Sequence, residues 1–408
     1  MTEQEFIRLL QEKKQEHLIK YYEQMTEQDK RNFTDQVSKI DWRLLENLKQ
    51  KDEPHKRGNI TPIKACTIAE INEYRHRYET MGLNAIREGK VAAVLLAGGQ
   101  GSRLGYDGPK GTVNIGETKK FYIFEALIQN TLEVTKKAGA YLPFYIMTSQ
   151  INHEETVSFM KEHDFFGYPE DYVKFFTQEM APCVDFDGKL LMEEVNHLAF
   201  SPNGNGGWFS SMEKNGILDD VHERGVKWLN VFAVDNVLQK IADPVFIGAV
   251  LASGGASGSK VVRKADPKER VGVMCLEDGK PSIVEYIEMT EDMVYEKTAS
   301  GDYAYNYGVI LNYLFRVDAL EEILRADMPI HFARKKIPYV TVDGEKVSPS
   351  EPNGYKFEVF ILDMIHLLDQ CLPYEVARNQ EFAPIKNATG VDSIESARAL
   401  LKENGKSL

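Results

Sequence analysis

Apolar side chains follow two patterns along the chain, and the change falls near residue 89. Through residues 1–88 they recur at every third or fourth position among polar side chains, which predicts amphipathic helices. Beyond residue 89 they gather into short continuous runs bounded by glycine and polar residues, which predicts strands buried on both faces of a sheet. The candidate strands are 90–97, 143–148, 228–234, 246–252, 271–275 and 307–313.

The predicted N-terminal helices carry sequence signals at their ends. Thr2 followed by Glu5 fits a capping box, and Thr26 and Asp41 are further candidate N-caps. A second helical run covers 68–88 and ends at a glycine. The runs are separated by the helix-interrupting residues Pro54, Gly58 and Pro62. We expect a helical region over 1–88 that packs as a layer on the core, with a docking or regulatory arm as the alternative.

Helical patterns at 121–138 and 154–162 lie between the candidate strands. Strands that alternate with helices indicate βαβ units, and hence an α/β fold with a mostly parallel sheet and flanking helices. We expect this core to cover 89–378 and a short C-terminal segment to cover 379–408. Ligands of such sheets bind at the carboxyl ends of the strands, so functional side chains are expected directly after each strand.

The first candidate strand ends in a glycine-rich loop, Gly98-Gly99-Gln100-Gly101-Ser102-Arg103-Leu104-Gly105, which is followed by Pro109-Lys110-Gly111. Glycines allow positive φ and close approach of the backbone to an anion, and two cations in the same loop suit a polyphosphate. The glycine spacing is not that of a dinucleotide-binding fingerprint, and no Gly-Lys-Ser/Thr of a P-loop opens a helix. The alternative is a tight turn with solvated charges.

Composition narrows the function classes. The 408 residues include 49 Lys+Arg and 62 Asp+Glu, which gives a formal net charge of −13 and argues against a general nucleic-acid binder. An anionic substrate therefore requires basic residues placed locally. Four scattered cysteines, the lack of an N-terminal secretion signal and the lack of a long apolar stretch favour a cytoplasmic protein with no membrane contact.

Asp235 is the clearest candidate metal ligand, because it ends the candidate strand 228–234. Mg²⁺ prefers one or two carboxylates together with substrate phosphates. The alternative is that Asp235 or Asn236 caps a helical turn over 237–241. The histidines show no zinc-binding spacing, and no nucleophile elbow is present.

The glycine loop resembles the signature of sugar-nucleotide pyrophosphorylases, and the resemblance extends over residues 85–400. It is most similar to the eukaryotic-type UTP:sugar-1-phosphate uridylyltransferases of the UDP-N-acetylglucosamine pyrophosphorylase branch, which includes bacterial members described as probable uridylyltransferases. The resemblance implies a Rossmann-like nucleotide-diphospho-sugar transferase fold. Further matching motifs include Ala181-Pro182-Cys183-Val184, Pro202-Asn203-Gly204-Asn205-Gly206-Gly207, Val234-Asp235-Asn236, Val284-Glu285-Tyr286, Gly354-Tyr355-Lys356-Phe357-Glu358 and Pro384-Ile385-Lys386-Asn387.

The resemblance implies a reaction between UTP and a sugar 1-phosphate that yields a UDP-sugar and pyrophosphate, with Mg²⁺ as cofactor. It assigns the catalytic, phosphate-holding role to Arg103, Lys110, Lys356 and Lys386. It assigns UTP and uridine binding to Leu96, Ala97, Gly98, Gly99, Gln178, Gly204 and Asp235, with Asp235 also the metal ligand. It assigns sugar binding to Asn205, Asn236, Glu285, Tyr286 and Asn306.

The chain departs from the family near the expected sugar pocket. Trp208-Phe209 replaces a Leu-Tyr pair, Tyr307 replaces a small residue and Val309 replaces a polar one. N-acetylglucosamine, N-acetylgalactosamine, glucose and galactose 1-phosphates therefore all remain open. Two other functions are alternatives: a nucleotide-sugar sensor or scaffold without turnover, and, with less support, a dinucleotide-dependent dehydrogenase.

Overall fold

The computed structural model describes residues 1–48, 57–325, 328–368 and 370–408. The chain divides into two compact units. Unit 1 comprises Met1–Lys56, Glu179–Gly207 and Met328–Ile361, and unit 2 comprises Arg57–Gln178, Trp208–Asp327 and Leu362–Leu408. The predicted helical region 1–88 is thus divided between the two units, and no division between them falls at residue 378. The predicted break residue Pro54 lies outside the described residues.

Unit 2 is built on a mixed sheet of ten strands, the largest sheet among the described residues. Its main path runs β1 (Ile60–Pro62), β12 (Val273–Glu277), β14 (Tyr307–Arg316), β10 (Trp228–Ala233), β2 (Val91–Leu96), β3 (Phe144–Thr148) and β4 (Val173–Thr177). Three further strands branch from it: β11 (Ser257–Arg263), β13 (Lys280–Val284) and β19 (Cys371–Glu375). The core strands β10, β2, β3 and β4 are parallel, whereas β14 is antiparallel to β10. The predicted α/β class is confirmed.

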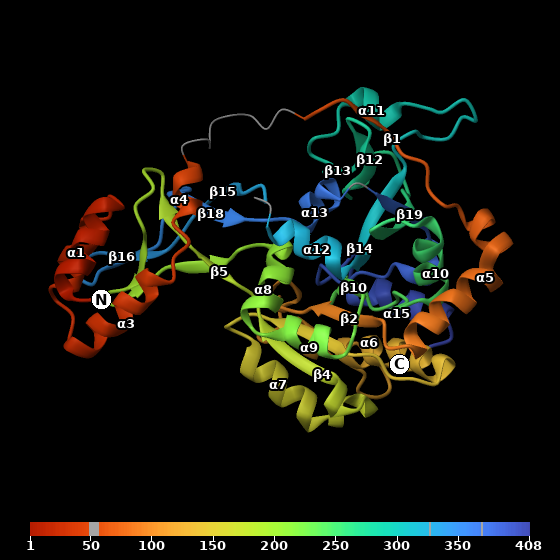
Figure 1. Cartoon of the computed structure of the whole chain (residues 1–408), viewed down its shortest axis with the longest axis horizontal. Coiled ribbons are helices and arrows are strands. Elements are labelled where there is room, and N and C mark those ends of the chain that lie inside the picture. The colour runs from red at the N-terminus through yellow and green to blue at the C-terminus, as the bar shows by residue number, and fades with distance from the viewer. Residues whose placement is uncertain (49–56, 326–327, 369) are drawn as a thin grey trace. The chain divides into compact units, whose positions relative to one another are not determined.

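Helices cover this sheet (Figure 1). The longer ones are α5 (Ile68–Arg87), α6 (Ile123–Ala138), α7 (His153–Glu162), α10 (Pro244–Ser253) and α15 (Ile394–Glu403). The shorter ones are α8 (Trp208–Lys214), α9 (Ile217–Glu223), α11 (Glu291–Tyr295), α12 (Val317–Leu324) and α14 (Arg378–Glu381), and α13 (Ile361–Leu367) begins where the two units divide. Short 3₁₀ turns occur at η2 (Ser102–Leu104), η3 (Lys110–Thr112), η4 (Asp164–Gly167) and η5 (Glu170–Tyr172).

One predicted strand, 246–252, is wrong: this run belongs to α10. Asp243 caps the helix by accepting a hydrogen bond from Val245 N, and Pro244 occupies its first position. Because the helix is buried on nearly all sides, its sequence is apolar throughout and shows no helical period. α5 packs beside α10 with the backbones in close contact, since a Cβ on Gly82 would overlap the carbonyl of Pro244 (Figure 1).

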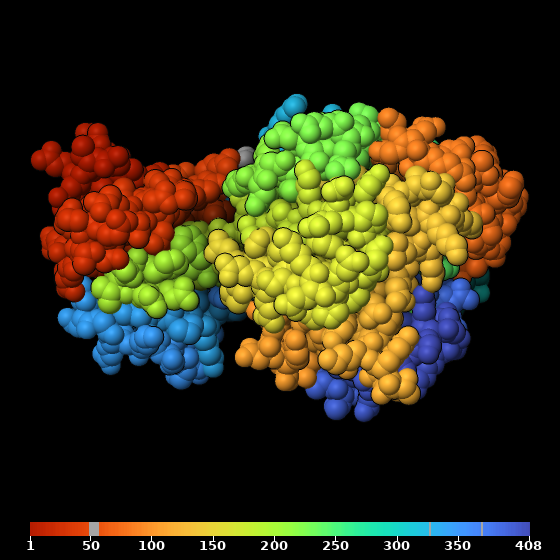
Figure 2. Space-filling model, turned by 90° about the horizontal axis from the view of Figure 1, so that it is seen from below, coloured from red at the N-terminus to blue at the C-terminus, as the bar shows by residue number. Residues whose placement is uncertain are grey.

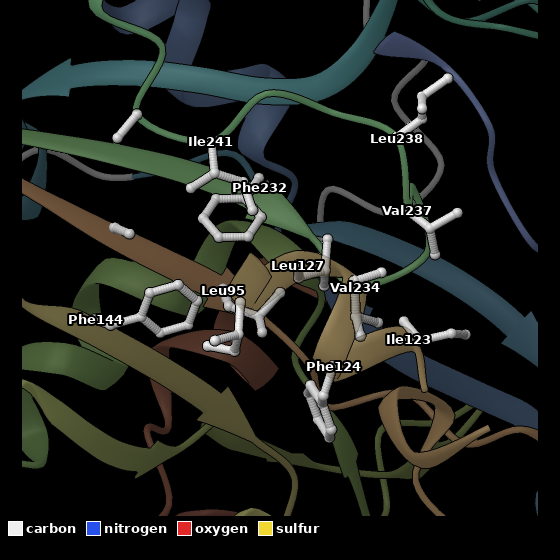
Figure 3. Packing of buried hydrophobic residues seen from close by; sticks show 14 of the residues in the cluster. Leu95, Ile123, Phe124, Leu127, Phe144, Phe232, Val234, Val237, Leu238 and Ile241 are labelled. Atoms are coloured by element: carbon white, nitrogen blue, oxygen red, sulfur yellow. The ribbon is translucent and has the colours of Figure 1, made fainter. Parts of the chain in front are cut away.

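The core of unit 2 lies between the parallel strands and α6. Leu95, Phe144 and Phe232 come from the neighbouring strands β2, β3 and β10 and face Leu127 of α6 (Figure 3). The rings of Phe144 and Phe232 meet edge to face, with centroids 6.0 Å apart. This packing holds the carboxyl ends of β2 and β10 side by side, which is where functional side chains were expected.

Unit 1 combines the N-terminal helices with small sheets from two later segments. Its helices are α1 (Glu3–Glu12), α2 (His17–Tyr22), α3 (Glu27–Ser38) and α4 (Arg43–Asn47), and the capping box of Thr2 and the cap at Thr26 are confirmed. Its strands are β5 (Met180–Pro182), β6 (Val184–Asp185), β7 (Met192–Glu194), β8 (His197–Leu198), β9 (Phe200–Pro202), β15 (His331–Lys335), β16 (Tyr339–Val340), β17 (Lys346–Val347) and β18 (Gly354–Glu358), and η6 (Asn205–Gly207) follows β9.

The helices of unit 1 pack on residues that lie far away in the sequence. Phe6, Leu10 and Phe33 form one apolar cluster with Leu198 and Phe357. In Figure 2 the red N-terminal helices lie against the yellow-green and light-blue segments of the same unit. Residues 1–48 therefore form a helical layer that is part of a packed core. Among the described residues, no helix combines the length and the apolar character that crossing a membrane requires.

Candidate functional site

The glycine loop begins directly at the carboxyl end of β2. Leu96 and Ala97 are buried, and Ala97 N donates to Met147 O of β3 at 2.8 Å. The side chain of Asn152 is fully buried and bonds to the backbone of this loop. Its Nδ2 donates to Ala97 O at 3.0 Å and to Gly99 O at 3.4 Å. Sequence analysis missed Asn152, whose only visible signal is its place before helix α7.

Three glycines of this region are closely packed and do not adopt positive φ. A Cβ on Gly98 would lie 2.8 Å from Gln178 Nε2, one on Gly101 would meet the Tyr106 ring, and one on Gly111 would overlap the Phe124 ring. Gly105 does adopt the left-handed region, with φ of 70°. By contrast, no heavy atom lies within 4 Å of a Cβ built on Gly99, so the loop is open beside that residue.

Gln178 lies where the sequence placed it, immediately after β4. Its backbone N donates to Thr148 O at 2.8 Å, and its amide lies against Gly98. The side chain is 9% exposed. An amide offers both a donor and an acceptor, so this group is equipped to read a heterocycle edge beside the loop.

Charged side chains gather at the carboxyl ends of β2 and β10. Lys110 Nζ lies 3.9 Å from Asp235 Oδ2. Lys110 also has electrostatic interactions with Lys386 and Arg103. The structure therefore brings together three of the four predicted catalytic residues and the predicted metal ligand within unit 2.

The surroundings of Lys110 disfavour its positive charge. Burial lowers the pKa of its ammonium, and the positive charges of Lys386 and Arg103 lower it further, while Asp235 opposes the shift. Its side chain is 15% exposed. Asp235 is the carboxylate that acts on Lys110, whereas Asp392 and Glu285 act on Lys386. The positive charge around Lys110 is therefore only partly offset, which favours the binding of a polyanion.

Asp235 is 22% exposed and follows β10 in a turn. Of the alternative role, capping a helical turn over 237–241, the structure shows only a bond from Leu238 N to Asn236 Oδ1 at 3.4 Å, and no helix forms over these residues. No group of three or more His, Cys, Asp or Glu side chains suited to a metal ion occurs among the described residues. One accessible carboxylate beside lysines fits an ion such as Mg²⁺, whose remaining ligands come from water and substrate phosphates.

Asn236 points away from solvent. It is 1% exposed, its Nδ2 donates to Glu381 O at 2.8 Å, and its Oδ1 accepts from Ala383 N at 2.9 Å and Leu238 N at 3.4 Å. These bonds occupy three of the four hydrogen-bonding positions of the amide. The Asn236 Oδ1 is therefore not free to accept a hydrogen bond from a sugar, as the predicted sugar contact would require.

The predicted sugar-binding segment lies at the end of β13. Glu285 is partly buried, and burial together with the Glu288 carboxylate raises its pKa, although Arg57 and Lys386 oppose the shift. Tyr286 is 43% exposed. Two side chains stabilise this segment. Arg57 donates to both carboxylate oxygens of Glu288, at 3.2 and 2.7 Å, and Glu288 in turn accepts from Glu285 N at 2.9 Å.

Two further residues border Glu285. A Cβ on Gly272 would lie 3.4 Å from Glu285 Oε1 and 3.5 Å from Val309. Val309, one of the departures from the family pattern, is therefore close to this carboxylate. Asn306 directly precedes β14 and accepts from Lys264 N through its Oδ1 at 3.2 Å.

The other departures lie in packed surroundings. Trp208 and Phe209 are 0% and 1% exposed, and the Trp208 ring stacks on Phe315 with centroids 6.0 Å apart. Tyr307 lies beneath the Arg263 guanidinium, 5.6 Å from the ring centroid. Trp208 and Phe209 thus belong to the packed core, whereas Val309 lies near Glu285.

The remaining predicted residues belong to unit 1. Gly204 has φ of 89°, and a Cβ there would overlap Val359 O, so only glycine fits. Asn205 Oδ1 accepts from Ile361 N at 3.0 Å. Lys356 lies in the centre of β18, between β15 and β6.

A family model described as UTP–glucose-1-phosphate uridylyltransferase matches residues 19–406. UDP-N-acetylhexosamine pyrophosphorylase-like protein 1 of Homo sapiens is 34% identical over 414 residues, which cover 96% of this chain and 82% of that protein. UDP-N-acetylglucosamine pyrophosphorylase of Saccharomyces cerevisiae is 37% identical over 346 residues, covering 81% and 72%.

A solved structure supports the same grouping. The uridine diphosphate N-acetylglucosamine pyrophosphorylase of Trypanosoma brucei, crystallised with an inhibitor, matches with a TM-score of 0.84 at 27% identity. The match covers 97% of this chain and 83% of that one. The glycine loop at β2, the charged cluster at β10 and these likenesses lead to one conclusion: the chain belongs to the UTP–glucose-1-phosphate uridylyltransferase family, in its UDP-N-acetylhexosamine pyrophosphorylase branch.

Proposed function

We propose that this protein is a Mg²⁺-dependent uridylyltransferase that joins UTP and an N-acetylhexosamine 1-phosphate to give a UDP-sugar and pyrophosphate. The observation that carries the proposal is the cluster of Lys110, Asp235, Lys386 and Arg103 at the strand ends of unit 2, in a chain that belongs to this family.

In this reaction a phosphate oxygen of the sugar 1-phosphate attacks the α-phosphorus of UTP. The bond from the α-phosphorus to the oxygen that bridges to the β-phosphorus breaks, and pyrophosphate leaves with that electron pair. Two polyanions must approach each other, and charge builds on the leaving group. The protein therefore acts by positioning and by electrostatic stabilisation.

Lys110 and Arg103 are proposed to hold the leaving β- and γ-phosphates, and Lys386 to neutralise charge from the opposite segment. Lys110 supplies a point charge on a partly buried stem, whereas Arg103 is exposed and offers a planar fork for bidentate contacts. From the sequence resemblance we also propose a phosphate contact for Lys356.

The nucleoside is proposed to bind along the loop 96–99. The open space beside Gly99 admits a ligand, and the Gln178 amide next to Gly98 is placed to bond to uracil. Asp235 is proposed to hold Mg²⁺, which supplies additional positive charge to the phosphates when bound. The resemblance adds Gly204 to the uridine contacts.

An N-acetylhexosamine is proposed as the sugar because the relatives at 34–37% identity are named for N-acetylhexosamine or N-acetylglucosamine. Glu285, Tyr286 and Asn306 are the proposed sugar contacts in unit 2, and Asn205 in unit 1. Val309 lies near Glu285 and is expected to tune the preference among sugars. The attribution to bacterial members stays a prediction from sequence.

A pyrophosphate-release assay with UTP, Mg²⁺ and a panel of sugar 1-phosphates tests this function. We expect turnover with an N-acetylhexosamine 1-phosphate, and loss of turnover in folded Lys110→Ala and Asp235→Ala variants. Nucleotide binding by calorimetry without any product would favour the sensor or scaffold instead. Full activity in both variants would show that the site is misassigned.

A further inference from the structure

The segment that carries Lys386 runs alongside the turn that carries Asp235. Ile385 N donates to Asp235 O at 2.9 Å, and Val237 N donates to Ala383 O at 3.4 Å. Asn236 and Pro384 form an antiparallel bridge between these bonds. Asp235 and Lys386 therefore each lie within one residue of a main-chain link between the two segments.

The Asn236 side chain completes this link. Its amide donates to one carbonyl of the second segment, that of Glu381, and accepts from the N–H of Ala383 two residues later. A two-way bond of this kind fixes both the distance and the register between segments. Because Asn236 is 1% exposed, water does not replace these bonds if they are lost.

The turn itself has no helix or strand to stabilise it, and a second buried amide supports it. Gln239 is 0% exposed and donates to Ala233 O and Asn236 O, both at 2.8 Å. Its Oε1 accepts from Asn312 Nδ2 of β14 at 3.1 Å. The position of Asn236 is thus tied to the central sheet.

A buried ion cluster fixes the second segment at its beginning. Lys260 is 0% exposed, and its Nζ lies 2.5 Å from Glu381 Oε2, 3.2 Å from Asp243 Oδ2 and 3.1 Å from Lys240 O. Burial opposes the charge on Lys260, but the two carboxylates hold its pKa above the usual value. A fully satisfied buried cluster specifies one arrangement of the segments it joins.

We propose that Asn236 is a positioning residue for the transfer reaction, acting through the main chain to keep Lys386 and Asp235 at a fixed separation. The inference rests on the proposed uridylyltransferase function. It replaces the sugar contact predicted for Asn236 with a role in holding the two charged groups that face the phosphates. Small displacements of such groups weaken the stabilisation of the leaving group more than they weaken substrate binding.

Asn230 provides a matched control for Asn236. It is also 1% exposed, its Nδ2 donates to Tyr313 O at 2.8 Å and to Asn312 Oδ1 at 2.9 Å, and its Oδ1 accepts from Ala242 N at 2.7 Å. Both asparagines thus donate to a backbone carbonyl and accept from a backbone N–H. Asn230 reaches the support of Asn236 only indirectly, through Asn312 and Gln239, whereas Asn236 itself makes these bonds to the segment of Lys386.

The experiment compares Asn236→Asp with Asn230→Asp in the full-length protein by steady-state kinetics at saturating Mg²⁺, together with thermal unfolding. Both variants should lose thermal stability. Asn236→Asp should lower kcat by about tenfold or more while the KM values for UTP and sugar 1-phosphate stay within about threefold. Asn230→Asp should keep kcat within about threefold of the wild type.

A pH profile separates positioning from general damage. A protonated Asp at position 236 regains an O–H donor towards the Glu381 carbonyl, so the ratio of its kcat to the wild-type kcat should rise as pH falls. Asn236→Ala cannot recover in this way and keeps the test valid if the Asp variant is poorly folded at neutral pH. It should show the same kcat loss at every pH.

Equal kcat losses in the two Asp variants, or an Asn236→Asp variant within about threefold of wild-type kcat, would overturn the inference. A rise in the KM for sugar 1-phosphate with unchanged kcat would restore the direct sugar contact and overturn it as well. Wild-type protein without turnover would overturn the proposed function, and the inference with it.

Discussion

Lys110 Nζ lies 3.9 Å from Asp235 Oδ2, joining the loop after β2 to the turn after β10. The contact places a cation proposed to bind phosphate next to the carboxylate proposed to bind the metal. Burial lowers the pKa of the Lys110 ammonium, and Asp235 offsets only part of this shift, because Lys386 and Arg103 add to it. This pair is therefore arranged for a ligand and not for the stability of the empty protein.

Replacing Lys110 should separate activity from stability. Lys110→Met is expected to lower kcat/KM by about 100-fold or more, because a positive charge near the leaving group is lost. Its melting temperature should not fall, because burying the ammonium costs free energy in the folded state. Lys39→Met and Lys137→Met, at exposed positions, should leave kcat/KM within about twofold. Equal losses at all three positions would show that the overall field governs binding.

As pH rises, UTP binding should weaken at a lower pH than it would with a lysine of ordinary pKa. The folded protein lowers the pKa of Lys110 below 10.5, so the free protein loses this proton at a lower pH. Bound triphosphate favours the protonated form, and the KM for UTP should therefore rise as pH increases through the lowered pKa. Lys110→Arg should move this rise to higher pH. An unchanged profile in that variant would exclude Lys110 as the titrating group.

Asp235 should govern the dependence on metal. Asp235→Asn is expected to raise the Mg²⁺ concentration for half-maximal activity by about tenfold or more, because one anionic ligand is lost. Asp318→Asn changes a carboxylate that is 68% exposed in α12 and should leave the Mg²⁺ titration unchanged. Titrations of both variants at fixed UTP check this. A normal Mg²⁺ requirement in Asp235→Asn would remove it from the metal site.

The ionised carboxylate of Glu285 should lower the stability of the folded protein at neutral pH. Its folded-state pKa is raised above the ordinary 4.5, so the folded protein holds this proton more tightly than the unfolded chain. The stability linked to it is fully present below about pH 4.5 and is lost as pH rises through the raised pKa. Glu285→Gln should melt higher than wild type at about pH 7, and the gap should close near pH 4. A constant gap would contradict this assignment.

The two adjacent loop glycines should respond differently to a methyl group. Gly99→Ala is expected to keep the melting temperature, since its Cβ meets no protein atom, while the KM for UTP rises by about tenfold because that space is needed by the nucleotide. Gly98→Ala pushes against the Gln178 amide and should impair both stability and UTP binding. An unchanged KM for UTP in Gly99→Ala would place the nucleotide elsewhere.

The fold class followed from the sequence because the parallel strands β2, β3 and β10 are buried on both faces and read as apolar runs. The same logic failed at 246–252, since a helix buried on all sides is apolar throughout as well. The Asp243-Pro244 start was the local signal for a helix. This signal identifies the run as a helix only when its packing partner α5 is known.

The charged cluster could be anticipated because the loop that carries Arg103 and Lys110 follows β2, Asp235 follows β10, and the ends of these two strands lie side by side. The direction of a side chain was not recoverable. Nothing in the residues around Asn236 distinguishes an amide that faces a ligand from one that faces Glu381 and Ala383, because that depends on a segment about 145 residues later. Arg57 escaped notice for the same reason, since its partner Glu288 is distant in sequence.

The reaction proposed for this site is the attack of a sugar 1-phosphate on the α-phosphorus of UTP. Incubating the protein with UTP, Mg²⁺ and N-acetylhexosamine 1-phosphate labelled with ¹⁸O in its phosphate, followed by mass spectrometry of the products, tests it most directly. We predict that the entire label appears in the UDP-sugar and that pyrophosphate carries none. Label in pyrophosphate, or the absence of any UDP-sugar from a folded protein, would exclude this reaction.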